Sequence, residues 1–314
     1  MREPWPALPY DEWSETCDTL HLWTQIVGKV KLALCPFLNE YWQVAFRLTA
    51  RGMTTGPIPY RGRSFEITFD FIDHNLFLQT SDGQVKALAL TSRPVADFYV
   101  DFMDVLAAAG IEVKINTMPT EVPDPISCEL DRVHASYDPE YVGRWAQVLL
   151  QTERVLERFR SGFAGKSSPI HFFWGSFDLA HTRFSGRRAP LLQGVPRFMQ
   201  VSEDQENFSC GFWPGNPTAA GVRLGQAAFY AYAYPEPAGF REEPLQPEGA
   251  YYDGRLGQPI LPYDAVRAGE DPEATLLTFY EHVYEMAARL GRWDRDLLEA
   301  RRPIALQRAP SRST

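Results

Sequence analysis

The sequence lacks the marks of membrane-spanning, secreted and disulfide-rich proteins. No stretch approaches the run of about 18 apolar residues that a membrane-spanning helix needs, and the N-terminus has no apolar signal-peptide core. Only 4 cysteines are present, far apart along the chain, and no CxxC pair occurs. We therefore expect reduced thiols in a cytoplasmic protein, with neither a zinc ribbon nor a thioredoxin-type site.

Motifs of several large enzyme classes are also missing. The chain contains no GxxxxGKS/T phosphate-binding loop, no GxGxxG turn after a strand, no GxSxG elbow and no HExxH helix. The regular alternation of strands and helices that builds a parallel sheet is absent as well. Nucleotide hydrolases, Rossmann-type enzymes and α/β-hydrolases are therefore disfavoured.

Composition indicates a globular chain that is acidic. The 314 residues are 45% hydrophobic and 23% charged, enough for one large domain or two smaller ones with a substantial core. Asp and Glu number 40 against 31 Lys and Arg, which gives a net charge of -9. This surplus opposes general nucleic-acid binding. We expect neither a nucleic-acid nor a membrane partner, and the sequence indicates no cofactor and no oligomeric state.

Residue patterns predict an α+β fold, with antiparallel sheets and helices packed on them. Apolar spacing predicts strands at 25–34, 42–51, 65–72, 76–80, 85–90, 111–115, 170–184, 208–213 and 227–234. Helical spacing predicts helices at 92–110, 138–159 and 271–291. An SDGQ turn joins the fourth and fifth strands and is a good hairpin signal.

Two of the predicted helices have the same arrangement of residues, which is compatible with an internal duplication. Segments 92–110 and 271–291 each have a capping residue, an early proline, an aromatic-rich stripe and a final glycine, and each ends a run of strands. The pattern fits two related α+β halves, residues 1–125 and 126–314, that can pack as one unit. Two ordinary amphipathic helices of any α+β protein explain it equally well.

Polar side chains alternate with apolar ones along three of the predicted strands. Lys29 lies on the polar face of segment 25–34, and Arg47 and Arg51 lie on the polar face of segment 42–51. If these strands are neighbours, one sheet face carries several cations beside the acidic residues of a third strand. Such a face is typical of solvated cross-strand ion pairs, and it also fits the charged floor of a cleft for a small anion.

Residues 169–188 read PIHFFWGSFDLAHTRFSGRR, a dense collection of polar and aromatic side chains. A straight strand of this length exceeds ordinary strands, so we expect a bend or turn at Trp174–Ser176. Beyond it, strand alternation places Asp178 on one face and Arg183 on the other. A buried aspartate needs a partner, so Asp178 is either a structural acid or a group for ligand binding or proton transfer.

Histidines raise the question of a metal site. His171, Asp178 and His181 have suitable ligand chemistry, but their spacing matches no strong pattern and strand alternation separates Asp178 from His181. His74, in the stretch DFIDH, falls at a strand end, where a turn is the simpler interpretation. We therefore predict no metal site.

Five stretches of the chain resemble a bacterial protein family whose members have no assigned function. They read WTQIVGKVKLAL at 23–34, TARGMTTGPIPY at 49–60, FEITFDFIDH at 65–74, SRPVADFY at 92–99 and SPIHFFWGSFDLAHTRFSGR at 168–187. The similarity extends from about Trp5 to about Trp293. That family often has an aliphatic residue in place of His181, which further disfavours a metal site there. The resemblance implies no mechanism, because no activity is established for the family.

Together these patterns favour an enzyme that acts on a small polar molecule, with an anion preferred, in a cleft between the two halves. The candidate residues are Asp178 and His171 for proton transfer, Lys29, Arg47, Arg51 and Arg183 for the anion, and Trp174 and Tyr232 for the cleft walls. Two other functions fit the same residues. One is a non-catalytic small-molecule-binding protein, and the other is an interaction protein whose polar strand faces are solvated.

Overall fold

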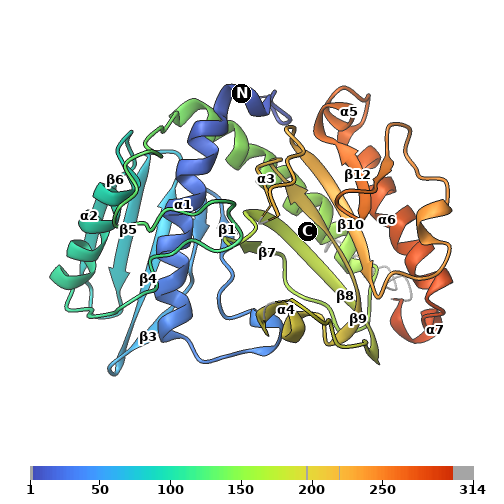
Figure 1. Ribbon diagram of the computed structural model, residues 1–314, viewed down its shortest axis with the longest axis horizontal. Coiled ribbons are helices and arrows are strands. Elements are labelled where there is room, and N and C mark those ends of the chain that lie inside the picture. Colours follow the sequence, from blue (N-terminus) through green and yellow to red (C-terminus); the bar gives the residue numbers. More distant parts are fainter. Residues whose placement is uncertain (1–2, 196, 219, 300–314) are drawn as a thin grey trace, which may run out of the picture.

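The computed structural model describes residues 3–195, 197–218 and 220–299 and shows two antiparallel sheets with helices packed on them (Figure 1). The predicted α+β class is confirmed. The first sheet has the order β1-β2-β4-β5-β6, with β3 paired to β4. Its strands are β1 (Arg47–Thr49), β2 (Gly52–Thr54), β3 (Ile58–Tyr60), β4 (Arg63–Asp70), β5 (Asn75–Thr80) and β6 (Val85–Ala89). The predicted SDGQ hairpin is the β5–β6 connection.

The second sheet follows the order β11-β12-β10-β9-β8-β7. Its strands are β7 (His171–Phe173), β8 (Asp178–Arg188), β9 (Gln205–Trp213), β10 (Ala228–Tyr234), β11 (Tyr251–Asp253) and β12 (Gln258–Pro262). The turn expected at Trp174–Ser176 is confirmed, because it closes the hairpin between β7 and β8. One strand predicted over 170–184 is therefore two paired strands.

Seven α-helices and two short 3-10 helices lie within the described residues. They are α1 (Tyr10–Leu34), α2 (Val95–Ala108), α3 (Pro139–Ser161), α4 (Arg197–Ser202), α5 (Tyr263–Arg267), α6 (Pro272–Leu290), α7 (Arg295–Leu298), η1 (Asn39–Tyr41) and η2 (Phe240–Glu242). Asp271 caps α6 through a side-chain oxygen that accepts a backbone N–H group, as predicted, and Asp138 caps α3 in the same way. The cap expected at Ser92 is wrong, because α2 begins after Pro94 and has no side-chain cap. Among these helices, none combines the length and apolarity that a bilayer crossing requires.

The strand predicted at 25–34 is wrong, because this segment is the C-terminal part of α1. Every residue from Leu20 to Lys31 is buried, so the helix has no exposed polar face. His21, Gln25 and Lys29, spaced four apart, give a helical signal that the strand prediction missed. Within QIVGKVKLAL, polar and apolar residues alternate as they do in a half-buried strand. Segment 111–115 was also expected to be a strand, but no neighbouring chain pairs with it and it is irregular.

The two sheets meet at one edge and share a core. An antiparallel bridge joins Phe46, just before β1, to Phe172 in β7, with N–O distances of 2.9 and 3.0 Å. Trp145 of α3 stacks on Phe177 and lies edge-on to Phe71, so one indole contacts aromatic rings from both ranges. The boundary at 125/126 falls in the connection between α2 and α3. It stays a prediction, as does duplication.

Helix α1 crosses the middle of the molecule and contacts both ranges (Figure 1). Trp23 of α1 stacks on Phe98 of α2, and Gly28 contacts the indole of Trp174 in the β7–β8 turn. A Cβ at Gly28 would overlap that indole, so the helix approaches the turn closely only because position 28 is glycine. The contact fixes the distance between α1 and the turn.

We predict that Gly28→Ala destabilises the protein by about 2 kcal/mol, although alanine is the better helix former. The added methyl group must displace the Trp174 indole. The free energy of unfolding is to be measured by denaturant titration. Gly254→Ala, in a turn with open space around the glycine, is the matched control and should leave stability nearly unchanged. An equal or higher stability for Gly28→Ala would contradict the packing described.

Candidate functional site

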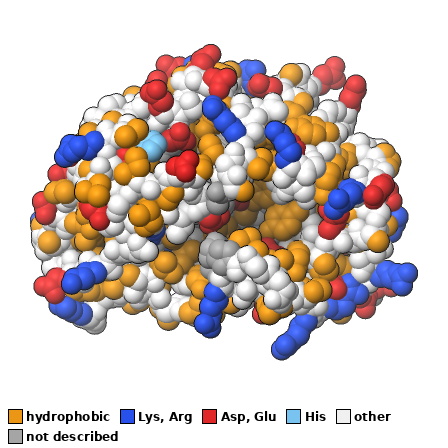
Figure 2. All heavy atoms as spheres, viewed as in Figure 1, with side chains coloured by type: hydrophobic (Ala, Val, Ile, Leu, Met, Phe, Trp, Pro, Cys, Tyr) orange, Lys and Arg blue, Asp and Glu red, His pale blue; other side chains and the backbone are white. Residues whose placement is uncertain are grey.

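Two joined hollows lie on the face of the second sheet that is turned away from α3 and α6. The larger hollow has a volume of about 440 Å³ and the smaller about 250 Å³, and Glu121, Ser176 and Tyr232 line both. Figure 2 shows this side of the molecule hollowed near its centre, with apolar side chains in and around the opening. Residues from 32–44 and 120–121 form one wall, and strands β8, β9 and β10 form the other.

The strands expose alternate residues to the hollows, as predicted for β8. Thr182 and Phe184 line the larger hollow and Asp178 lines the smaller one. His181 and Arg183 point the other way, and the rings of Phe159 in α3 lie against both. Thr182 and Ser209 of β9 are hydroxyl neighbours at 2.7 Å on the hollow side.

Asp178 is buried and hydrogen bonded. Its carboxylate accepts hydrogen bonds from the Ser176 hydroxyl and from the phenol of Tyr230. A Cβ at Gly211 would lie only 2.8 Å from the Tyr230 oxygen, so glycine at this position lets the phenol reach Asp178. Burial raises the pKa of Asp178, and the two hydroxyl hydrogen bonds oppose that rise.

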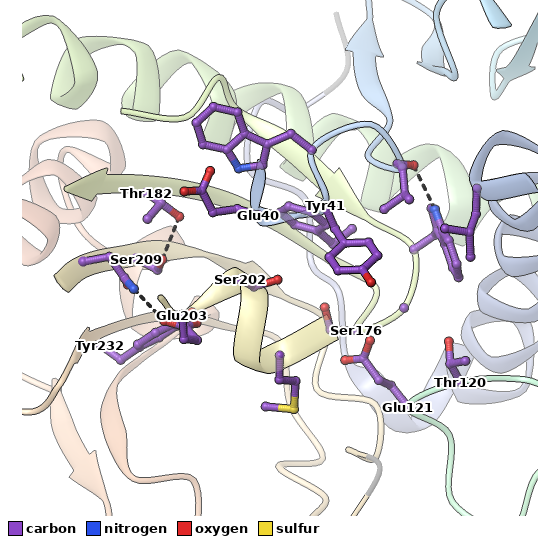
Figure 3. A pocket seen from close by; sticks show the side chains of 18 of the residues that line it. Glu40, Tyr41, Thr120, Glu121, Ser176, Thr182, Ser202, Glu203, Ser209 and Tyr232 are labelled. Carbon is purple, nitrogen blue, oxygen red and sulfur yellow. Dashed lines mark hydrogen bonds between the residues drawn. The ribbon is translucent and has the colours of Figure 1, made fainter. Parts of the chain in front are cut away.

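Glu121 faces the same place from the opposite wall and has no such partners (Figure 3). No hydrogen bond or ion pair joins its carboxylate to another residue in the part of the chain that the structure describes. Burial, followed by the charge of Asp178, raises the pKa of Glu121 to about 7. Its backbone φ is 57°, a left-handed conformation that costs about 1 to 2 kcal/mol for a residue other than glycine.

The carboxylate of Glu121 lies against Gly175. An oxygen of Glu121 occupies the space that a Cβ at position 175 would fill, so no larger residue can stand there without moving the acid. Gly175 is itself held from behind, since Nε2 of His21 lies 2.9 Å from its carbonyl oxygen, which accepts the hydrogen. The ring of His21 stacks on Phe177. Burial lowers the pKa of His21 to about 4, so this donor is a neutral imidazole near pH 7.

Three buried polar residues spaced four apart on α1 hold both loops of this wall. Besides His21, the side chain of Gln25 accepts from the N–H of Thr120 at 2.8 Å and donates to its carbonyl oxygen at 2.7 Å. Lys29 donates to the carbonyl oxygen of Met118. These bonds fix the backbone on which Glu121 stands, and they make α1 the support of the candidate acid.

Two more carboxylates lie toward the other end of the larger hollow. Glu203 follows α4 and accepts hydrogen bonds from Asn207 at 2.5 Å and from the Tyr232 phenol at 3.2 Å. Glu40 of η1 accepts from Lys166 at 3.3 Å. Burial raises the pKa of both acids. Glu40 and Tyr41 have backbone φ angles of 50° and 56°, so this wall is also strained.

Of the residues singled out from the sequence, Asp178, Trp174 and Tyr232 line the hollows. Trp174 donates its indole N–H to the carbonyl oxygen of Val44 at 2.9 Å and forms a wall. His171 lines neither hollow. It is buried beside Trp42, with ring centroids 5.8 Å apart, and burial lowers its pKa to about 3.

The four cations expected to hold an anion do not converge, and none lines a hollow. Lys29 supports the loop at Met118 as described above. Arg51 pairs with Asp70 and Asp73 at 2.6 Å on the first sheet, and Arg47 is exposed on β1. Arg183 is buried between α3 and α6 over the rings of Phe159, Phe163 and Tyr284. The main reason that the predicted cationic face does not form is that segment 25–34, which carries Lys29, is part of helix α1 and not a strand of the sheet.

The histidines considered as metal ligands lie apart. His74 contacts the phenol of Tyr137 at 2.9 Å, whereas His171 and His181 are buried elsewhere. Nδ1 of His171 and both ring nitrogens of His181 have no hydrogen-bond partner among the described residues. Within residues 3–195, 197–218 and 220–299, no group of three or more His, Cys, Asp or Glu side chains is placed to hold a metal ion.

Comparison with known proteins places the chain in a family. A model of a family of unknown function, DUF5996, matches residues 5–300. The chain belongs to this family. No curated protein and no solved structure matches it. The resemblance found in the sequence to a family of unknown function is therefore confirmed, and the DUF5996 family supplies no activity to carry over.

The sequence did not reveal Glu121, Glu203 or Glu40 as site residues in this DUF5996 protein. Glu121 lies in a proline-rich connection, PTEVPDP, that resembles an ordinary ordered loop. Glu203 follows a helix of only six residues. The one local signal is the glycine of WGS, which the close approach of Glu121 requires.

We predict that one glutamate of the wild-type protein titrates near pH 7 and that Glu121→Gln removes this titration. Because the folded state holds the proton more tightly than the unfolded chain, wild-type stability falls relative to Glu121→Gln as pH rises from 4.5 to about 7. The difference is on the order of 3 kcal/mol. Carbon NMR of labelled glutamate and denaturant titrations at several pH values measure both effects. Parallel stability curves for the two proteins would contradict a raised pKa.

We predict that Gln25→Leu lowers the pKa of Glu121 toward its ordinary value of 4.5, because the loop that buries the acid is released. Stability should fall by about 1 to 3 kcal/mol through the lost hydrogen bonds. The same NMR titration gives the pKa. Gln147→Leu on α3, a half-buried glutamine outside both hollows, is the control and should leave the Glu121 pKa unchanged. An unchanged Glu121 pKa in Gln25→Leu would rule out the supporting role of α1.

Proposed function

We propose that this DUF5996 protein is an enzyme that moves protons on a small polar molecule, with Glu121 as the acid and base and Asp178 as its partner. The observation that carries the proposal is the unpaired carboxylate of Glu121 facing Asp178 across a hollow. Residues on both sides of the 125/126 boundary line the hollows, which supports a ligand position between the two halves. Cytoplasmic location stays part of the proposal, supported by four cysteines without disulfides.

The environment of the two acids suits proton transfer. A carboxyl group with a pKa near 7 both holds and releases a proton at neutral pH, which is the condition for efficient general acid–base catalysis. Asp178 is held in one orientation by Ser176 and Tyr230, so its charge acts on Glu121 from a fixed place. Glu121 has a strained backbone, and its carboxylate requires a glycine at position 175. Strain of this kind is often found at functional sites, which supports a functional role for Glu121.

The lining favours a neutral or positively charged molecule over the anion expected from the sequence. Glu40, Glu121, Asp178 and Glu203 line the hollows, whereas no lysine, arginine or histidine of the described residues does so. An anion would lie beside several carboxylates without a cation to bind it. Aromatic rings of Trp42, Phe173, Trp174 and Phe184 offer apolar walls for the rest of the ligand.

Incubation with a fractionated extract of cell metabolites, followed by mass spectrometry, tests the proposal. The wild-type protein should consume at least one compound and form a product. Glu121→Gln should slow that conversion by about 100-fold or more, because general acid–base catalysis contributes factors of this size. Glu281→Gln, an exposed glutamate on α6, is the control and should react like the wild type.

Two results would overturn the proposal. Retention of a compound without conversion would indicate a non-catalytic binding protein. Conversion at an equal rate by Glu121→Gln would show that the proton is carried by another group.

A further inference from the structure

We infer that the substrate of this site carries a positively charged amine and that Glu203 is the residue that recognises it. The inference rests on the proposed function and extends it to the substrate class. It starts from the charges at the far end of the larger hollow, where Glu40 and Glu203 lie near enough for the charge of Glu40 to raise the pKa of Glu203. Lys166 is the cation paired with Glu40. Glu203 has no cationic partner among the described residues.

Lys166 does not line the hollow, but it shows how Glu40 and the rings beside this end bind an ammonium group. Its Nζ lies 3.3 Å from a Glu40 oxygen, 4.9 Å from the centre of the Phe184 ring and 5.5 Å from the centre of the Trp42 ring. A carboxylate together with aromatic faces is the chemistry by which proteins bind organic cations. Phe184 and Trp42 also line the larger hollow, so the same rings are available to a ligand.

Asn207 holds the Glu203 carboxylate in a fixed orientation. Its amide nitrogen donates to Glu203 and to the carbonyl oxygen of Gln205, and these two acceptors fix which end of the amide is nitrogen. The amide oxygen therefore faces away from both, and it has no partner among the described residues although Asn207 is 1% exposed. Asn207 therefore orients the Glu203 carboxylate, and the three donors of an ammonium group would meet that carboxylate.

Tyr232 connects this corner to the acids at the other end. Its phenol donates to Glu203, and its side chain lines both hollows together with Glu121 and Ser176. In Figure 3, Glu203 and Tyr232 lie at one end of the larger hollow and Glu121 and Ser176 at the other. A molecule with its amine at Glu203 can therefore extend along Tyr232 and present a second polar group to Glu121 and Asp178.

Calorimetric titration with three probes of one shape tests the inference. Benzylamine is positive at pH 7, benzyl alcohol is neutral and benzoate is negative. The wild-type protein should bind benzylamine about tenfold or more tightly than benzyl alcohol, since a hydrogen bond to a charged group is worth about 1.5 to 3 kcal/mol. Benzoate should bind weakest. Glu203→Gln, which keeps the side-chain shape, should abolish the preference for the amine.

Asp204→Asn is the matched control, because it removes the same charge at the next position, is exposed and lies outside the lining. It should keep the preference for benzylamine. Equal or absent binding of benzylamine and benzyl alcohol to the wild type would overturn the inference, as would a preference that survives in Glu203→Gln. Neither result touches the proton-transfer proposal, which depends on the separate rate measured for Glu121→Gln.

Discussion

The site depends on one energetic conflict, a half-buried Glu121 carboxylate with no counter-charge among the described residues. Transfer of a lone carboxylate out of water costs free energy, and proteins usually compensate for this cost with a cation or with several hydrogen-bond donors. Here neither is present among the described residues, and the neighbouring Asp178 worsens the conflict. Protonation, water in the hollows or a ligand must therefore stabilise the carboxylate. What keeps the acid in place is backbone support from Gln25 and the space left by Gly175.

Much of the fold was predictable because its signals are local. Asp138 and Asp271 mark helix starts, SDGQ marks a hairpin, and strand alternation gives the facing of β8 correctly. Helix α1 was not predictable in this way. Its residues from Leu20 to Lys31 are buried against α2, α3 and the β7–β8 turn, so the exposed face that identifies a surface helix is missing. The spacing of His21, Gln25 and Lys29 by four residues is the one sequence signal for the helix, and the strand prediction missed it.

The site was predictable in part for the same reason. Asp178, Trp174 and Tyr232 lie on strands and turns whose geometry follows from nearby sequence, and they line the hollows. The cations were placed together on the assumption of a strand at 25–34, and the assumption failed. Glu121 and Glu203 reach the hollows through contacts with residues distant in sequence, such as Gln25 and Tyr232. No local pattern encodes such contacts, so the acidic character of the site emerged only in three dimensions.

Helix α1 has a consequence for how this protein can be divided. By sequence it belongs to the first range, yet His21 binds the carbonyl of Gly175 and Gly28 receives the indole of Trp174 from the second. The backbone bridge between Phe46 and Phe172 also joins the two ranges. A fragment ending before α3 would leave the buried ring of His21 without its partner at Gly175, and the complementary fragment would lose the helix that packs behind its β7–β8 hairpin. Each range therefore needs the other to complete its packing. Fragment reassembly or circular permutation must preserve the contacts of His21, Gly28 and Phe46 with the second range.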